Sequence, residues 1–231
     1  MRFGVVIFPG SNCEQDAVHA IRHLGMQADF VWHGETDLSG FDAIVLPGGF
    51  SYGDYIRCGA VARFSPVMAE VVRFAERGGP VIGICNGFQI LTEAHLLPGA
   101  LLRNRGLKFI CTAVDLRVEE SACQWLDLPA GSVVRIPINH NEGNYICDAE
   151  TLKRLEANGQ IVLRYCEPDG SRAEGGSAPN GALDDIAGIC NERGNVFGLM
   201  PHPERAVDPI SGGADGVHFF TAIARQVAAL G

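Results

Sequence analysis

Hydrophobic residues in the first half of the chain form short unbroken runs that alternate with stretches of helical spacing. Unbroken apolar runs are typical of strands buried on both faces of a parallel sheet. We expect such strands at residues 3–8, 28–32, 43–46 and 81–85. Apolar residues between the runs recur at every third or fourth position, which predicts helices. We expect one helix that contains Ala17, Ile21 and Leu24, and two further helices at residues 66–77 and 87–95.

The second half of the chain is richer in short β-branched runs separated by Gly, Asn, Asp and Pro, a pattern that indicates strands. We expect strands at residues 109–118, 133–138, 161–165, 186–190 and 196–200, and helices at 149–157 and 217–230. Residues 167–181 are rich in Gly, Pro and Ser and predict a surface loop that is too short for an interdomain linker. The sequence therefore predicts a single α/β domain over residues 1–231. Its central sheet is mostly parallel and flanked by helices, with extra antiparallel strands in the second half.

Composition narrows the functional classes. The 231 residues carry a formal net charge of −9, which argues against nucleic acid as the main ligand because phosphate binding needs a concentrated basic surface. No apolar run approaches the roughly 20 residues that cross a bilayer. The 8 cysteines show neither Cys-x-x-Cys spacing nor a zinc-ligand pattern. This lack of ligand spacing favours a protein without a metal site. Since the chain opens directly on a predicted strand, we expect a cytoplasmic protein with reduced cysteines.

The strongest chemical signal is the segment Gly83-Ile84-Cys85-Asn86-Gly87, which lies between a predicted buried strand and a helix. It has the form of a nucleophile elbow, with cysteine in the place of serine. The glycines let the chain turn sharply, and the positive end of the following helix favours the thiolate of Cys85. A buried core thiol is the alternative interpretation for an isolated cysteine.

A candidate base follows the last predicted strand, in Met200-Pro201-His202-Pro203-Glu204. A thiol nucleophile needs a base that takes its proton and later returns it to the leaving group. His202 has the right chemistry, and Glu204 can bind the other imidazole nitrogen and fix the tautomer. Pro47-Gly48-Gly49 follows another strand of the same predicted edge, so its backbone N–H groups could form part of an oxyanion hole.

These segments together resemble the class I (triad) glutamine amidotransferases, which have Cys-x-Gly-x-Gln (here Cys85–Gln89), an upstream Pro-Gly-Gly and a late His-Pro-Glu. Longer segments resemble the family of glutaminase subunits of phosphoribosylformylglycinamidine synthase, an enzyme of purine synthesis. The segments that carry this narrower resemblance are Phe8-Pro9-Gly10-Ser11-Asn12-Cys13, Gly48-Gly49-Phe50-Ser51-Tyr52-Gly53-Asp54-Tyr55, Gly83-Ile84-Cys85-Asn86-Gly87-Phe88-Gln89, Glu142-Gly143-Asn144-Tyr145 and the segment from Gly198 to Arg205.

The resemblance implies a flavodoxin-like fold and hydrolysis of L-glutamine to glutamate and ammonia. It implies the catalytic residues Cys85, His202 and Glu204, and oxyanion N–H groups on Gly49 and Asn86. It also implies substrate contacts from Gln89, Gly48 and Phe50.

The same resemblance implies partner proteins. An ATP-dependent synthetase subunit would receive the ammonia and convert formylglycinamide ribonucleotide to its amidine, and a small bridging subunit would join the two. ATP and Mg²⁺ are expected on the synthetase, because this chain has neither a P-loop nor a dinucleotide fingerprint. We expect no cofactor in this chain.

Other interpretations stay open. The chain could serve a different triad amidotransferase, act as a cysteine hydrolase on γ-glutamyl or peptide substrates, or be an inactive binding subunit. His140 with Glu142 could be taken for metal ligands, but we expect a loop that faces solvent or a partner. The chain departs from the family at Asn141, where glycine is usual, and at Ala178 and Ala182, where asparagine and serine are usual.

Overall fold

A computed structural model of the protein describes residues 1–210 and 213–230, of which 228–230 are described by their backbone alone. Its main sheet has nine strands in the order β2-β1-β3-β4-β11-β10-β9-β6-β7, and β5 and β8 pair separately. The strands are β1 (Arg2–Ile7), β2 (Gln27–Trp32), β3 (Ala43–Leu46), β4 (Val81–Ile84), β5 (Ala100–Leu102), β6 (Ile110–Val118), β7 (Val133–His140), β8 (Asn144–Ile146), β9 (Ile161–Cys166), β10 (Ile186–Cys190) and β11 (Val196–Leu199).

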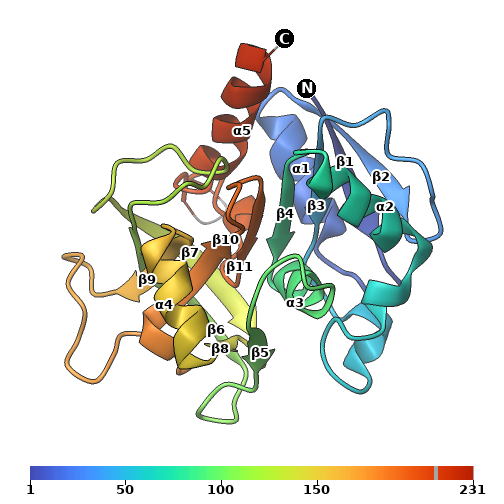
Figure 1. Ribbon diagram of the computed structural model, residues 1–231. Coiled ribbons are helices and arrows are strands. Elements are labelled where there is room, and N and C mark those ends of the chain that lie inside the picture. Colours follow the sequence, from blue (N-terminus) through green and yellow to red (C-terminus); the bar gives the residue numbers. More distant parts are fainter. Residues whose placement is uncertain (211–212, 231) are drawn as a thin grey trace.

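The helices connect these strands and cover the sheet (Figure 1). They are α1 (Glu14–His23), α2 (Pro66–Glu76), α3 (Asn86–Glu93), α4 (Ala149–Ala157) and α5 (Val217–Leu230). Short 3₁₀ turns are η1 (Ser51–Asp54), η2 (Ala62–Phe64), η3 (Leu183–Asp185) and η4 (Pro203–Arg205).

The sheet has a parallel half and an antiparallel half. Strands β2, β1, β3, β4 and β11 pair in parallel, whereas β11, β10, β9, β6 and β7 pair in antiparallel fashion. Figure 1 shows β4 and β11 in the middle of the molecule, with the two halves on either side. The predicted α/β fold is confirmed, and the extra antiparallel strands continue the same sheet.

Helices cover both faces of the parallel half, as β11 shows. Phe197 is fully buried and its ring stacks on Phe219 of α5, with centroids 6.3 Å apart. The next residue, Gly198, faces the other way, since a Cβ on it would lie 2.1 Å from the ring of Phe88 in α3. Successive residues of a strand point to opposite faces, so α5 and α3 lie on opposite sides of the sheet.

All of the predicted strands and helices are present, with ends that differ by one or two residues. Residues 167–181 contain no helix or strand, as expected. The pair β5–β8 was not predicted, because strands of three residues leave too short a pattern to read. Within the described part of the chain, no helix is long and apolar enough to span a membrane.

The packing of β11 on α5 gives a first testable prediction. Replacement of Phe197 by alanine removes a fully buried ring from the middle of the sheet. We expect the free energy of unfolding to fall by about 3–5 kcal/mol, measured by urea denaturation. The matched control is Phe109→Ala, because Phe109 is 50% exposed and its truncation should cost less than about 1 kcal/mol. Equal losses in the two variants would contradict this packing.

Candidate active site

The parallel strands bring the predicted site residues to one edge of the sheet. Leu46 of β3 pairs with Gly83 of β4, and Ile84 of β4 pairs with Leu199 of β11. The three strands therefore end side by side, and the turns that follow them carry Gly48 and Gly49, Cys85, and His202. This edge is where open α/β sheets bind their ligands.

Cys85 has a backbone conformation that few residues adopt, with φ 52° and ψ −105°. Such a conformation persists only where the surrounding structure enforces it, and it is frequent at active sites. Two flanking glycines make it possible. A Cβ on Gly83 would lie 2.5 Å from the carbonyl oxygen of Gly87, and a Cβ on Gly87 would lie 1.9 Å from that of Leu46. The segment is therefore a nucleophile elbow, and α3 begins at the next residue.

His202 and Glu204 form a buried pair. The imidazole Nδ1 lies 2.6 Å from Oε1 of Glu204, and both side chains are almost completely buried. In the described part of the chain, Nε2 of His202 has no hydrogen-bond partner, so it is free to exchange a proton with a ligand. Burial opposes a charge on the ring, but the Glu204 carboxylate and, after it, Cys85 outweigh this and raise the pKa of His202.

A pocket of about 240 Å³ opens at this edge. Of the predicted residues, Cys85, His202, Gly49, Gln89 and Phe50 line it, whereas Asn86, Glu204 and Gly48 do not. The other residues in its wall are Asn12, Cys13, Gly53, Asp54, Cys58, Asn139, His140, Asn141 and Glu142.

Gly48 lies behind the pocket. A Cβ on it would lie 2.8 Å from the ring of His202 and 3.1 Å from Sγ of Cys13, so its lack of a side chain makes room for these two residues. Gly49 has φ 143°, and its Cα packs against the backbone of Ser11 and Asn12. In the described part of the chain, the Gly49 N–H donates no hydrogen bond, which leaves it available to a ligand.

The side chains of Asn86 and Gln89 bond within the protein. Asn86 accepts from the N–H of Ser51 at 3.0 Å and donates from Nδ2 to Gln89 Oε1 at 2.8 Å. Gln89 donates from Nε2 to the carbonyl of Glu142 at 2.6 Å. Gln89 therefore joins the first turn of α3 to the loop after β7. The backbone N–H of Asn86, in that first turn, has no partner within its helix.

His140 is buried at the end of β7, so its side chain does not face solvent as expected, whereas a partner-facing loop after it stays a prediction. Its side chain is 3% exposed at the end of β7, and Nε2 lies 3.2 Å from Nδ2 of Asn180. Burial, together with the nearby charge of His202, lowers the pKa of His140 to about 3. Since Asn180 donates to Nε2, the proton is assigned to Nδ1, which has no partner among the described residues.

Asn180 connects the 167–181 loop to the site. Fully buried, it donates from Nδ2 to the carbonyl of Gly143 at 2.9 Å, and the same nitrogen lies 3.1 Å from the hydroxyl oxygen of Tyr165. Asn104 braces the same segment from the other side, because it donates to the carbonyl of His140 and accepts from the N–H of Gly143.

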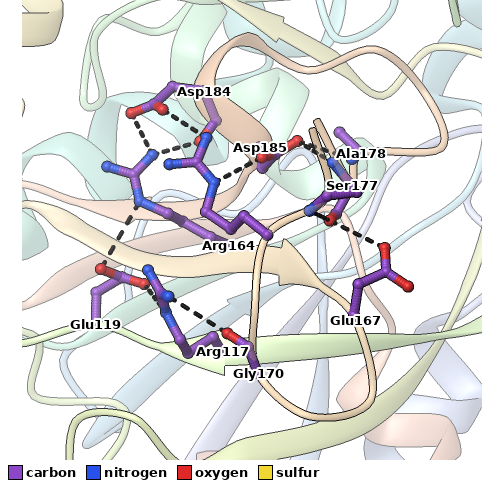
Figure 2. A network of polar contacts seen from close by, with 11 residues as sticks. Arg117, Glu119, Arg164, Glu167, Gly170, Ser177, Ala178, Asp184 and Asp185 are labelled. Atoms are coloured by element: carbon purple, nitrogen blue, oxygen red, sulfur yellow. Dashed lines mark hydrogen bonds and ion pairs between the residues drawn. The ribbon is translucent and has the colours of Figure 1, made fainter. Parts of the chain in front are cut away.

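A polar network anchors the loop that carries Asn180 (Figure 2). Asp185 accepts hydrogen bonds from the N–H groups of Ser177 and Ala178 at 2.7 and 2.8 Å and pairs with Arg172. Asp184 pairs with Arg172. It also pairs with the buried Arg164, as Figure 2 shows. Asp184 and Asp185 both have positive φ, a strained arrangement for consecutive non-glycine residues that the ion pairs hold in place.

One group of potential metal ligands occurs in the described part of the chain. Ligand atoms of Cys13, His202 and Glu204 lie within 4.8 Å of one another. Nδ1 of His202 and Oε1 of Glu204 bond to each other, and Cys13 donates to Asn12 and accepts from Arg205. The expectation that the site uses no metal stays a prediction.

Several of these residues were missed in the sequence. Asn12 and Cys13 follow β1, another strand of the parallel half. Their position at this edge could therefore have been predicted from the sequence. Asn139 and Glu142 belong to the end of an antiparallel strand and the loop after it, and their position depends on how β6 and β7 fold back on the sheet.

Comparison with known proteins identifies the family. Residues 1–213 match the model of the CobB/CobQ-like glutamine amidotransferase domain. The chain belongs to this family. A Gloeobacter violaceus protein named phosphoribosylformylglycinamidine synthase subunit PurQ is 56% identical over all of both chains. A Thermomicrobium roseum protein of the same name is 58% identical over 96% of this chain and 95% of that one.

Solved structures agree with this assignment. The amidotransferase resembles a chain in the structure of PurLQS from Thermotoga maritima, with a TM-score of 0.86, 44% identity and 98% coverage of both chains. Another glutamine amidotransferase from Thermotoga maritima aligns with a TM-score of 0.56 and 15% identity, over 100% of this chain and 93% of that one, which shows a shared fold. The predicted resemblance to the class I amidotransferases is confirmed.

The depressed pKa of His140 makes folding stability depend on pH. Its pKa is about 3 when folded and 6.5 in the reference state, so only the unfolded chain binds this proton between those values. Stability should therefore fall as the pH falls from about 6 to about 4, by up to about 1.4 kcal/mol per pH unit from this residue. Urea unfolding of the protein and of His140→Asn over that range measures the difference. Identical pH slopes would show that His140 is protonated in the fold.

Proposed function

We propose that this chain hydrolyses L-glutamine to glutamate and ammonia, as the glutaminase subunit of phosphoribosylformylglycinamidine synthase. The observation that carries the proposal is a strained elbow cysteine in one pocket with a histidine whose second nitrogen binds a buried glutamate. Relatives that are 54–58% identical and bear that subunit's name support the choice of complex.

In the proposed reaction, Cys85 is the nucleophile and His202 is the base. Nε2 of His202 takes the thiol proton, and the Glu204 carboxylate stabilises the imidazolium that results. The positive end of α3 stabilises the negative charge on sulfur. The thiolate then attacks the side-chain carbonyl carbon of glutamine.

The tetrahedral intermediate carries its charge on oxygen. We assign the N–H groups of Gly49 and Asn86 as its donors, because neither has a partner in the described part of the protein. His202 protonates the nitrogen, ammonia leaves, and a γ-glutamyl thioester remains on Cys85. His202 then takes a proton from water, which attacks the thioester and releases glutamate and the free thiol.

The other predicted residues receive modified roles. Phe50 lines the pocket and is 48% exposed, which suits a substrate contact at the entrance. Gln89 lines the pocket but also joins α3 to the loop after β7. Gly48 leaves room for His202, so we assign it no contact with glutamine.

The ammonia passes to an ATP-dependent synthetase subunit, which forms formylglycinamidine ribonucleotide in purine synthesis. A small third subunit bridges the complex, and ATP and Mg²⁺ act on the synthetase. The name of the solved Thermotoga maritima assembly supports a complex of this kind. We place the complex in the cytoplasm.

A decisive test separates glutamine use from synthesis. Cys85→Ala removes the nucleophile while it leaves the synthetase untouched. In the assembled complex we expect glutamine-dependent synthesis to fall by at least about 10³-fold while synthesis from added ammonia continues. Product formation measured with each nitrogen source checks this.

Labelling provides the control. A glutamine-like diazo-ketone should modify Cys85, with protection by glutamine, and should spare the exposed thiol of Cys111. Loss of ammonia-dependent synthesis in a folded Cys85→Ala complex would contradict the division of labour. Support of a different ammonia acceptor would favour another triad amidotransferase, and cleavage of peptides would favour an elbow hydrolase.

A further inference from the structure

The two proposed oxyanion donors are joined by the short segment of residues 49–52. The segment begins at Gly49, the first donor, which forms an isolated β-bridge with Ser11. Two residues later, the buried N–H of Ser51 donates at 3.0 Å to the side chain of Asn86. The backbone N–H of that same Asn86 is the second donor. The position of residues 49–52 therefore determines how the two donors lie relative to each other.

This segment ends in η1, where the backbone is strained. Tyr52 has φ 54° and ψ 27°, and positive φ recurs at Asp54 and Ile56. Residues with a side chain rarely adopt this left-handed conformation, which persists only where other contacts enforce it. The backbone supplies one such contact, because the Tyr52 N–H donates to the carbonyl of Pro9. Residues 49–52 thus keep their position only while contacts of this kind hold.

The side chain of Tyr52 supplies further contacts. Its hydroxyl oxygen lies 3.0 Å from Nδ1 of His33 and 2.8 Å from Oγ of Ser65. A phenol hydroxyl donates one proton and also accepts, so it can bond to both groups at once. The rings of His33 and Tyr52 also meet edge to face, with centroids 5.8 Å apart and planes at 82°. We call the side chains of Tyr52, His33 and Ser65 the Tyr52 anchor.

The anchor is attached to regular elements of the fold. His33 directly follows β2, and its N–H donates to the carbonyl of Ile7 at the end of β1. Its own carbonyl accepts from the N–H of Val67 in α2. Ser65 directly precedes α2 and is 6% exposed. The Tyr52 hydroxyl is therefore bound by two groups whose backbone is fixed by the sheet and by α2.

We propose that the Tyr52 anchor positions the oxyanion hole, because it fixes residues 49–52 and so aligns the N–H of Gly49 with that of Asn86. This inference rests on the proposed glutaminase activity. None of the three side chains of the anchor lines the catalytic pocket, so they act through the backbone and are positioning residues. Donors stabilise a developing oxyanion only when they are already aimed at the place where its charge appears.

Removal of single polar groups tests the proposal. Tyr52→Phe keeps the ring and removes the hydroxyl. His33→Leu removes the nitrogen beside that hydroxyl, whereas His33→Asn keeps an amide that can take the place of Nδ1. The matched control is Tyr55→Phe, which removes a hydroxyl from a 75% exposed ring directly after η1.

Two measurements in the assembled complex separate the oxyanion hole from the nucleophile. Release of glutamate from glutamine passes through an oxyanion and gives kcat and KM. Alkylation of Cys85 by iodoacetamide, followed by peptide mapping, forms a carbon–sulfur bond and expels iodide without an oxyanion. A variant with a misaligned oxyanion hole should therefore lose glutaminase activity and keep the alkylation rate.

We expect Tyr52→Phe and His33→Leu to lower kcat about five- to thirtyfold, less than the roughly 10²–10³-fold loss of a whole oxyanion donor. KM and the rate of Cys85 alkylation should each change less than about twofold. His33→Asn should recover most of the kcat that His33→Leu loses, and Tyr55→Phe should behave like the unmodified protein. Synthesis from added ammonia should stay unchanged in every variant.

Other outcomes would overturn the inference. An unchanged kcat in Tyr52→Phe would mean that the hydroxyl does not position the oxyanion hole. A parallel loss of Cys85 alkylation would mean that the anchor supports the whole elbow, and a higher KM with unchanged kcat would mean that it acts on substrate binding. If the unmodified complex released no glutamate, the proposed function itself would fail, so the two failures are distinguishable.

Discussion

The structure depends on one tight contact, the approach of the first turn of α3 to the end of β3. Gly87 lies so near the carbonyl of Leu46 that no side chain fits between them, and a Cβ on Gly83 would likewise clash with α3. This contact forces the chain through the strained conformation at Cys85 and places the sulfur at the sheet edge. The free N–H groups of the helix, the neighbouring His202 and the pocket all take their positions from that turn.

The two histidines of the pocket show how environment divides one side-chain type into two roles. Both are almost fully buried, and burial alone would keep each neutral. Glu204 supplies a charge that favours protonation of His202, whereas His140 contacts the amide of Asn180. One imidazole is therefore suited to carry a proton, while the other is a fixed neutral donor.

Distant segments maintain this arrangement. The ion pairs around Asp184 and Asp185 hold the 167–181 loop, the loop presents Asn180, and Asn180 holds His140 and Gly143 beside the pocket. Asn104 repeats the brace from another loop. These hydrogen bonds fix the part of the pocket wall that loops of the antiparallel half build.

The sequence by itself determined the strands and helices, the elbow at Cys85 and the pairing of His202 with Glu204. These features follow from local rules, since apolar periodicity, glycines around a sharp turn and residues two positions apart act within a few residues of chain. Because parallel strands end at one edge of the sheet, the sequence also predicted that Gly49 and Cys85 lie close together. For the same reason, family resemblance could be read from short segments.

Only the tertiary structure decided the rest. The burial of His140, the position of Gly48 behind the pocket and the hydrogen bond from Ser51 to Asn86 depend on contacts between segments far apart in the sequence, and no local pattern encodes them. Gln89 was expected to face the substrate, and the fold additionally makes it the link between α3 and the loop after β7. Functional residues that lie within one turn can be predicted from the sequence. Functional contacts between different loops depend on the strand register and the packing that bring those loops together.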